Sequence, residues 1–146
     1  MSTSKMSGAA DIAAAFAAVG GNLATPMAAA SRKALRPMLK QAKATAPVDS
    51  GDLKKSLTVK RSRRVPKGVV EHQVGPSKDY VGADGSKPIR YAHLTEFGKA
   101  DGSQKGTRWM SRAFEETKAE TIEEFGKAMG PEIEKAAARR AKRRAK

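Results

Sequence analysis

The sequence lacks cysteine altogether, and it contains few aromatic residues and no long apolar run. Without cysteine, the chain of 146 residues can form neither a disulfide nor a thiolate metal site, and it has no cysteine nucleophile. This absence is compatible with a reducing cytoplasm. No apolar stretch approaches the roughly 20 residues of a transmembrane helix. The apolar residues 12–19 follow an aspartate rather than a basic cluster, so we expect no signal peptide and no membrane partner.

Bulky apolar residues are scarce as well. Aromatic residues make up only 5% of the sequence, and alanine is abundant. Alanine favours helix but buries little apolar area. The length fits one domain, and such a domain is expected to have a thin core, which oligomerisation often supplements. We therefore expect a single folded domain over residues 25–134 that gains stability from copies of itself and from partner proteins.

Acidic residues are outnumbered, with 15 Asp and Glu against 29 Lys and Arg, which gives a formal net charge of +14. Such an excess predicts a polyanionic or acidic neighbour: nucleic acid, an anionic membrane or an acidic protein surface. Two basic clusters could neutralise phosphates and so release counterions, without sequence readout. The alternative is a solvated tail or an arm on an acidic protein. The candidates for DNA contact are Lys60, Arg61, Arg63, Arg64 and Lys67, then Arg139, Arg140, Lys142, Arg143 and Arg144.

The first third of the chain has the pattern of helices. Residues 1–24 are expected to form a flexible segment that contains a short alanine-rich helix over residues 9–19, ended by two glycines. Thr25 is a candidate N-cap followed by a proline, and apolar residues then recur at helical spacing to about residue 45. Pro37 lies inside this second helix and is expected to kink it, because proline lacks an N–H and clashes with the preceding turn.

The middle of the chain has corner and strand patterns. Pro47 ends the helix, Asp49 or Ser50 can cap a short helical turn, Gly51 permits tight geometry, and Leu53 anchors the turn in the core. Residues 57–61 and 69–74 predict a β-hairpin with a basic tip. Residues 75–88 predict a loop that contains a short strand at residues 80–81, and residues 91–97 predict a short helix ended by a glycine.

A long C-terminal helix is expected to start at Trp109. Its apolar residues predict one buried stripe: Met110, Phe114, Ile122, Phe125, Met129 and Ile133. Gly130-Pro131 is expected to break or bend this helix, and residues 135–146 to form a basic C-terminal tail. The predicted fold is α+β, with N-terminal helices, a small antiparallel hairpin and a long C-terminal helix broken at Gly130-Pro131.

Catalytic patterns are missing from the sequence. Residues 102–107 lack the spacing and the preceding strand of a phosphate-binding loop, and no serine lies in a nucleophile elbow. His93 and Glu96 could share a helix face, but His72 is the only other histidine, too few ligands for zinc. We expect no metal, no cofactor and no enzyme activity. Glu96 is expected to pair with an arginine or lysine, and Trp109 to be core or a subunit anchor.

Three motifs occur in a specific order. Ala46-Pro47 is followed by Ser50-Gly51-Asp52-Leu53 before the hairpin; Tyr91-Ala92 is followed by Glu96-Phe97-Gly98; and Trp109 to Phe114 starts the last helix. Over residues 28–130, this order resembles a family of tailed-phage neck and tail-completion proteins, often labelled minor tail components. Arg108-Trp109-Met110 departs from the proline and leucine that usually start the last helix. The matching residues are Ala46, Pro47, Ser50, Gly51, Leu53, Tyr91, Ala92, Glu96, Gly98, Trp109 and Phe114.

The resemblance implies a structural virion protein of the head–tail junction, made in the cytoplasm of the host bacterium. Proteins of that family form or join a ring of copies between the head connector and the tail tube, around the DNA path. The implied partners are copies of the chain, the head connector or adaptor, the tail-tube or tail-terminator protein, and packaged double-stranded DNA. The alternatives are a tail terminator or head-closure protein or, outside phage, a non-specific nucleic-acid-binding basic protein.

Overall fold

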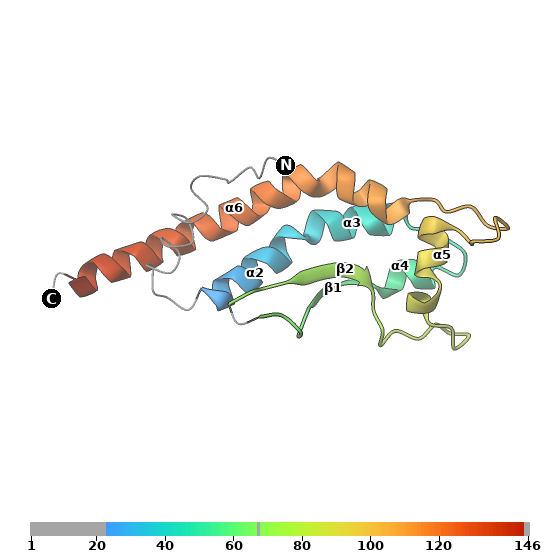
Figure 1. Cartoon of the computed structure of the whole chain (residues 1–146), viewed down its shortest axis with the longest axis horizontal. Coiled ribbons are helices and arrows are strands. Elements are labelled where there is room, and N and C mark those ends of the chain that lie inside the picture. The colour runs from blue at the N-terminus through green and yellow to red at the C-terminus, as the bar shows by residue number, and fades with distance from the viewer. Residues whose placement is uncertain (1–22, 67, 145–146) are drawn as a thin grey trace, which may run out of the picture.

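A computed structural model of the chain describes residues 23–66 and 68–144. The helix expected over residues 9–19 lies outside the described residues. The elements are helices α2 (Ala24–Ala34), α3 (Arg36–Thr45) and α4 (Asp52–Ser56), strands β1 (Leu57–Arg61) and β2 (His72–Pro76), the 3₁₀ turn η1 (Pro88–Arg90), and helices α5 (Ala92–Phe97) and α6 (Trp109–Arg144). In Figure 1, α2 and α3 lie between α6 and the hairpin, while α4 and α5 gather at one end of the elongated molecule. The α+β layout is as predicted.

The second predicted helix is divided in two just before its proline. Leu35 separates α2 from α3 and leaves Pro37 in the first turn of α3. A backbone N–H in the first turn has no carbonyl partner within the helix, so the helix loses no hydrogen bond at this proline. Proline therefore starts a new helix here instead of kinking the middle of one. The predicted cap at Thr25 is wrong, because α2 already begins at Ala24 after Leu23, without a side-chain cap.

Helix α6 begins at Trp109 as predicted, but the predicted break at Gly130-Pro131 is wrong. The helix runs through Pro131 to Arg144. Met129, just before the proline, is only 4% exposed, and α2 packs along this part of α6. A single proline removes one hydrogen bond from the helix, and α6 continues through it.

The hairpin has the first strand where the sequence predicts it, while the second strand lies later. Leu57 pairs with Pro76, Val59 with Val74 and Arg61 with His72 in an antiparallel ladder. The buried Leu57 sets this register, so the strand propensity of residues 69–71 is overridden. The predicted strand at residues 80–81 is absent: this segment is irregular, and the Tyr80 hydroxyl is bound to α4.

The core lies where α3, α4, β1 and the start of α6 meet. Its buried residues are Ala42, Ala46, Leu53, Leu57, Trp109 and Ala113. Three of the six are alanines, so α3 and α6 can approach closely while Trp109, 1% exposed, fills most of the remaining volume. The scarcity of bulky apolar residues thus produces a thin core centred on one tryptophan.

At the start of α6 the buried face is shifted by one residue from the predicted stripe, whereas Met129 of that stripe is buried as predicted. Trp109, Ala113 and Thr117 are buried, whereas Phe114 is 49% exposed and Ile122 is 72% exposed. The reason is that α6 packs on α3 through small residues, which places the line of small side chains inward and the larger ones beside it. Phe114 and Ile122 of the predicted stripe therefore remain on the surface.

Candidate functional site

The residues before α4 form a corner that combines three local devices. The Ala46 N–H donates to the Ala42 carbonyl and closes α3 at 2.9 Å. Gly51 has a φ of 80°, a left-handed conformation that favours glycine. The Ser50 hydroxyl accepts the Asp52 N–H at 3.3 Å, but the N-cap residue of α4 is Gly51, so neither Asp49 nor Ser50 occupies the cap position predicted for them. This corner points Leu53 into the core, buries Asp52 and leaves residues 48–50 exposed.

Asp52 links the corner to the loop that follows β2. Its carboxylate accepts hydrogen bonds from the hydroxyls of Ser50 and Tyr80, both at 2.8 Å. The hydrogen bond from Ser50, followed by that from Tyr80, lowers the pKa of Asp52 below its ordinary value. Asp52 therefore stays ionised near neutral pH and fixes the loop against α4.

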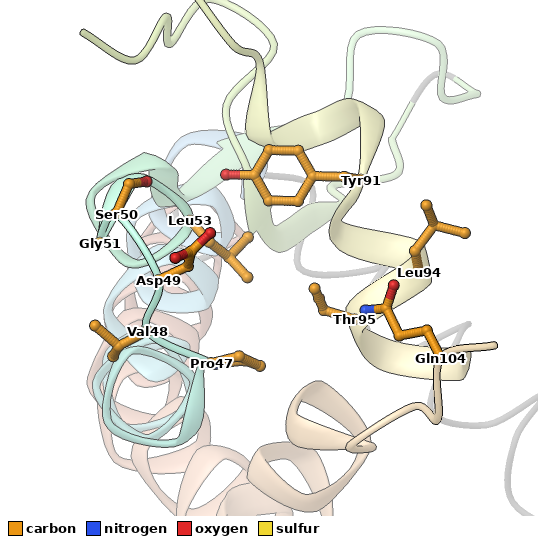
Figure 2. Close-up of a pocket in the computed structure, with 10 residues that line it drawn as sticks. All are labelled: Pro47, Val48, Asp49, Ser50, Gly51, Leu53, Tyr91, Leu94, Thr95 and Gln104. Atoms are coloured by element: carbon orange, nitrogen blue, oxygen red, sulfur yellow. The ribbon is translucent and has the colours of Figure 1, made fainter. Parts of the chain in front are cut away.

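Helix α5 presents its two ends to different surfaces. Tyr91, which precedes it, directs its hydroxyl towards the corner before α4 (Figure 2). Burial, followed by the nearby negative charges of Asp52 and Asp84, raises the pKa of Tyr91, so the phenol is protonated at neutral pH. At the other end Gly98 has a φ of 86°, and a Cβ there would lie 2.5 Å from the Gln104 carbonyl oxygen. Only glycine lets the loop of residues 99–107 close so tightly on α5.

Glu96 holds the first turn of α6. Its carboxylate accepts the N–H of Met110 at 2.8 Å and of Ser111 at 3.0 Å, together with the Ser111 hydroxyl. Burial alone raises the pKa of Glu96, but the hydrogen bonds from Ser111 and Met110 and the Arg108 charge outweigh it, so the pKa lies below its ordinary value. Within the described chain, the partner of Glu96 is thus the N-terminus of a helix, not the arginine or lysine side chain that the sequence analysis expected.

The first two motifs together line a pocket, called the motif cleft below (Figure 2). It has a volume of about 350 Å³ and is bordered on one side by the corner and on the other by α5 and the following loop. Its lining residues are Pro47, Val48, Asp49, Ser50, Gly51, Leu53, Tyr91, Leu94, Thr95 and Gln104. Segments some forty residues apart in the sequence therefore build one surface with mixed apolar and hydrogen-bonding chemistry.

Ala92 and Glu96 face away from the motif cleft, towards a second pocket. This apolar groove lies between α5, β2 and the start of α6 and has a volume of about 570 Å³. Met38, Val74, Pro76, Phe97, Met110 and Phe114 line it. Phe97 is 66% exposed at its edge, and the guanidinium of Arg108 stacks 5.6 Å from the centre of its ring. The groove is thus a mainly apolar depression on the surface of the molecule.

The pair of His93 and Glu96 does not form a metal site. The Glu96 carboxylate is fully used by the start of α6, while His93 is exposed. In the described part of the chain, no group of three or more His, Asp or Glu side chains could hold a metal ion.

The two basic clusters lie towards the same end of the molecule. The hairpin tip and the C-terminal half of α6 both extend away from the end that holds α4 and α5 (Figure 1). Arg61, Arg63 and Arg64 are exposed, while Lys60 is paired with Asp79 at 2.8 Å. Arg139 and Lys142 are exposed on α6. Lys67 lies outside the described residues, as do the side chains of Arg140, Arg143 and Arg144.

Comparison with known proteins identifies the family. Residues 10–98 match the family described as "Bacteriophage HK97-gp10, putative tail-component". The matched range is more than half of the chain and contains both motifs that line the cleft. The chain belongs to this family. No curated protein and no solved structure is significantly similar to it.

Membership of the HK97-gp10-like family supports a structural role in a phage virion. Tail components are structural proteins, typically without enzyme activity, that contact other phage structural proteins. The match begins earlier than the resemblance over residues 28–130 and ends at Gly98, so the start of α6 lies outside it. No helix among the described residues is both long enough and apolar enough to span a bilayer.

Several residues of this end were not singled out from the sequence. Thr95 accepts the Trp109 indole N–H at 3.1 Å, and its carbonyl accepts the N–H of Thr107 at 2.9 Å. Ser111 completes the cage around Glu96. The sequence could have indicated Ser111, because it lies in the first turn of the last helix. That turn has no acidic residue, so its free N–H groups need an acceptor from another part of the chain. Nothing local in the sequence identifies Thr95.

Proposed function

We propose that the chain is a structural protein of the phage head–tail junction, a neck or tail-completion protein. Copies would form or join a ring between the head connector and the tail tube, around the DNA path. The observation that carries this proposal is the division of the molecule along its long axis: the motif cleft and the apolar groove lie at one end and the exposed arginines at the other. A ring subunit needs such a division, because one surface contacts neighbours while another faces DNA.

The end with the two pockets is suited to protein partners. Phe97, Phe114 and Ile122 remain exposed around a thin core, and contiguous exposed apolar surface is typical of protein interfaces. The partners we propose are copies of the chain, the head connector or adaptor, and the tail-tube or tail-terminator protein. The contacts are non-covalent, so the role needs no cofactor and no bond chemistry.

The other end is suited to the packaged double-stranded DNA. Arg61, Arg63 and Arg64 on the hairpin and Arg139 and Lys142 on α6 are exposed, and exposed guanidinium and ammonium groups bind phosphates without reading sequence. Five glutamates of α6, from Glu115 to Glu124, lie in its first half, whereas Glu132 and Glu134 lie nearer its basic end. Glu132 is paired with Lys135 at 2.8 Å. Most of the carboxylates of α6 therefore lie apart from the exposed basic residues at its C-terminal end.

The direct test is electron microscopy of particles made by a phage that lacks the gene. The proposal expects free filled heads and free tails in place of joined particles, with joining restored when the intact chain is supplied. A matched pair of complementing variants sharpens the test. Glu96→Gln on α5, which disturbs the cap of α6, should restore less joining than Glu120→Gln on the exposed face of α6. Normal numbers of joined particles without the gene would exclude the proposal.

Separate purification of free heads and free tails also discriminates between roles within the junction. A chain that purifies with free tails is a tail-completion or tail-terminator protein, whereas one that purifies with free heads is a head-closure protein. A chain found on neither, but which binds DNA tightly and salt-sensitively when isolated, would instead be a free nucleic-acid-binding protein.

A further inference from the structure

The apolar groove is an open surface that needs an occupant. Met110 and Phe114 of α6, Phe97 of α5, and Val74 and Pro76 of β2 line one continuous apolar depression of about 570 Å³. Phe97 and Phe114 expose 66% and 49% of their surface. Water contact with two phenylalanine rings is unfavourable, so an apolar partner of helical width would be bound mainly by burial of these rings.

The chain itself contains a segment with the matching chemistry. Residues 9–19 have the sequence AADIAAAFAAV, with one charged residue and many alanines. Ile12, Phe16 and Val19 recur at the spacing that places them on one face of a helix, and the alanines between them allow close approach. Most of this segment lies within the range matched to the family. As a helix it would be about 16 Å long at ~1.5 Å per residue.

The segment cannot fill the groove of its own chain. Residues 20–22 separate it from Leu23, so an extended connection places Val19 at most roughly 14 Å from Leu23. Leu23 and Met38, the groove residue contributed by α3, lie about 20 Å apart along α2 and α3, at ~1.5 Å per residue. The remaining groove residues on α5 and α6 lie further towards the end with the motif cleft. The side chains of Ile12, Phe16 and Val19 could therefore all bind in one groove only if that groove belongs to another copy.

We propose that residues 9–19 of one copy dock as a helix in the apolar groove of the next copy. The donor segment leaves one end of the molecule and the acceptor groove lies towards the other, so the contact is head-to-tail. Repetition of a head-to-tail contact produces a closed ring when its rotation closes. The inference thus rests on the proposed ring, and it names the contact that joins neighbouring subunits. Every copy is both donor and acceptor.

Cross-linking can test the contact in the intact chain, because the protein has no cysteine of its own. Phe16→Cys and Phe114→Cys are prepared as separate full-length variants, one of them tagged, then mixed and treated with a short bis-maleimide. The proposal expects a covalent dimer that contains one Phe16→Cys chain and one Phe114→Cys chain. Phe16→Cys mixed with Ala119→Cys is the matched control, since Ala119 is exposed on another face of α6.

The double variant Phe16→Cys/Phe114→Cys separates the two directions of docking. Docking between copies gives cross-linked dimers, trimers and larger oligomers. Docking within one chain gives only an internally cross-linked monomer, and that result would overturn the proposal. The same reaction is run on purified protein and on particles assembled with the variant. A yield no higher than that of the Ala119→Cys control in both samples also overturns it. Cross-linking of Phe114→Cys to a different phage protein, with none to Phe16→Cys, does so as well.

A second pair of variants avoids reliance on cysteine chemistry. Phe16→Ser should weaken self-association about tenfold or more, because it removes a buried ring, whereas Ala17→Ser beside it should change association far less. Analytical ultracentrifugation measures both. Equal association of the two variants would contradict the docking. Counting joined particles in the same infections tests the head–tail role separately, so either idea can fail alone.

Discussion

The two ends of the molecule are built by different means. At the packed end, formed by α4, α5 and the first turns of α6, the main side chains have fixed partners: Trp109 is buried against alanines and bound to Thr95, and Glu96 is bound to the start of α6. At the basic end, formed by the hairpin tip and by α6 after Met129, none of the described residues 131–139, 141 and 142 is buried.

The difference assigns separate tasks to the two ends. A few buried side chains hold the packed end together, so substitutions there should alter stability and, through it, assembly. The basic end carries charge on an exposed hairpin and an exposed helix, so substitutions there should alter binding and leave stability nearly unchanged. Measurements that separate stability from binding can therefore test the division directly.

The largest expected effect is at Trp109. Trp109→Ala should lower the free energy of unfolding by about 3–5 kcal/mol, because it leaves a cavity among alanines that cannot fill it. Phe114→Ala, on the same helix but half exposed, should cost under about 1 kcal/mol. Urea unfolding followed by circular dichroism measures both. Similar losses for the two variants would mean that the core is not centred on the tryptophan.

The next effect is at Glu96. Glu96→Gln should cost about 2 kcal/mol near neutral pH, since a hydrogen-bonded carboxylate is replaced by a neutral amide whose NH₂ faces donors. Because the folded pKa is below the ordinary 4.5, the stabilisation is fully present above that value and is lost as the pH falls through the folded pKa.

The pH dependence gives the check on Glu96. Urea unfolding at several pH values should show the difference between the wild type and Glu96→Gln shrinking in acid. Glu120→Gln, at an exposed acid of α6, should stay within about 0.5 kcal/mol of the wild type throughout. A difference between Glu96→Gln and the wild type that is independent of pH would show that the carboxylate charge plays no part.

At the basic end the expected effect is on binding. Replacement of both Arg63 and Arg64 by glutamine should reduce the slope of log affinity for double-stranded DNA against log salt by about 2, because each arginine neutralises one phosphate. Both arginines are exposed, so the unfolding midpoint should hardly move. Fluorescence anisotropy over a salt series measures the slope. Arg112→Gln, exposed near the packed end, serves as the control and should leave the slope unchanged.

The smallest global effect is expected at Pro131. Pro131→Ala restores a helix hydrogen bond, but the described residues after it are not buried. The added local stability should therefore slow amide exchange in residues 132–142 while it changes global unfolding by under about 0.5 kcal/mol. A large global gain would show that the basic end is coupled to the core and would break the division between the ends.

Local chemistry accounts for the elements that the sequence predicts well. Pro47, Gly98 and the polar loop before Trp109 mark element ends at the predicted residues, because proline and glycine restrict or release the backbone whatever surrounds them. Strand β1 is predicted at its observed bounds. The corner and the α5 segment were also singled out as motifs, although the sequence does not indicate that they share one cleft.

Apart from the local cap predicted at Thr25, the incorrect predictions involve residues whose partners are distant in the sequence. The second strand follows the register set by Leu57, and the helix that continues through Pro131 packs against α2. Periodicity identifies an apolar stripe on α6, but it cannot show that α3 approaches the neighbouring line of small residues. The partner of Glu96 was unpredictable in the same way, because it lies after a loop.

The sequence by itself determined where most helices begin and end, the first strand, the excess of positive charge and the scarcity of large apolar residues, since these depend on local backbone preferences and composition. Tertiary structure decided which face of α6 is buried, that Glu96 caps this helix, that two separate motifs line one cleft, and that both basic clusters lie towards one end. These features depend on which surfaces pack together, and close packing is a property of the whole folded chain rather than of any segment.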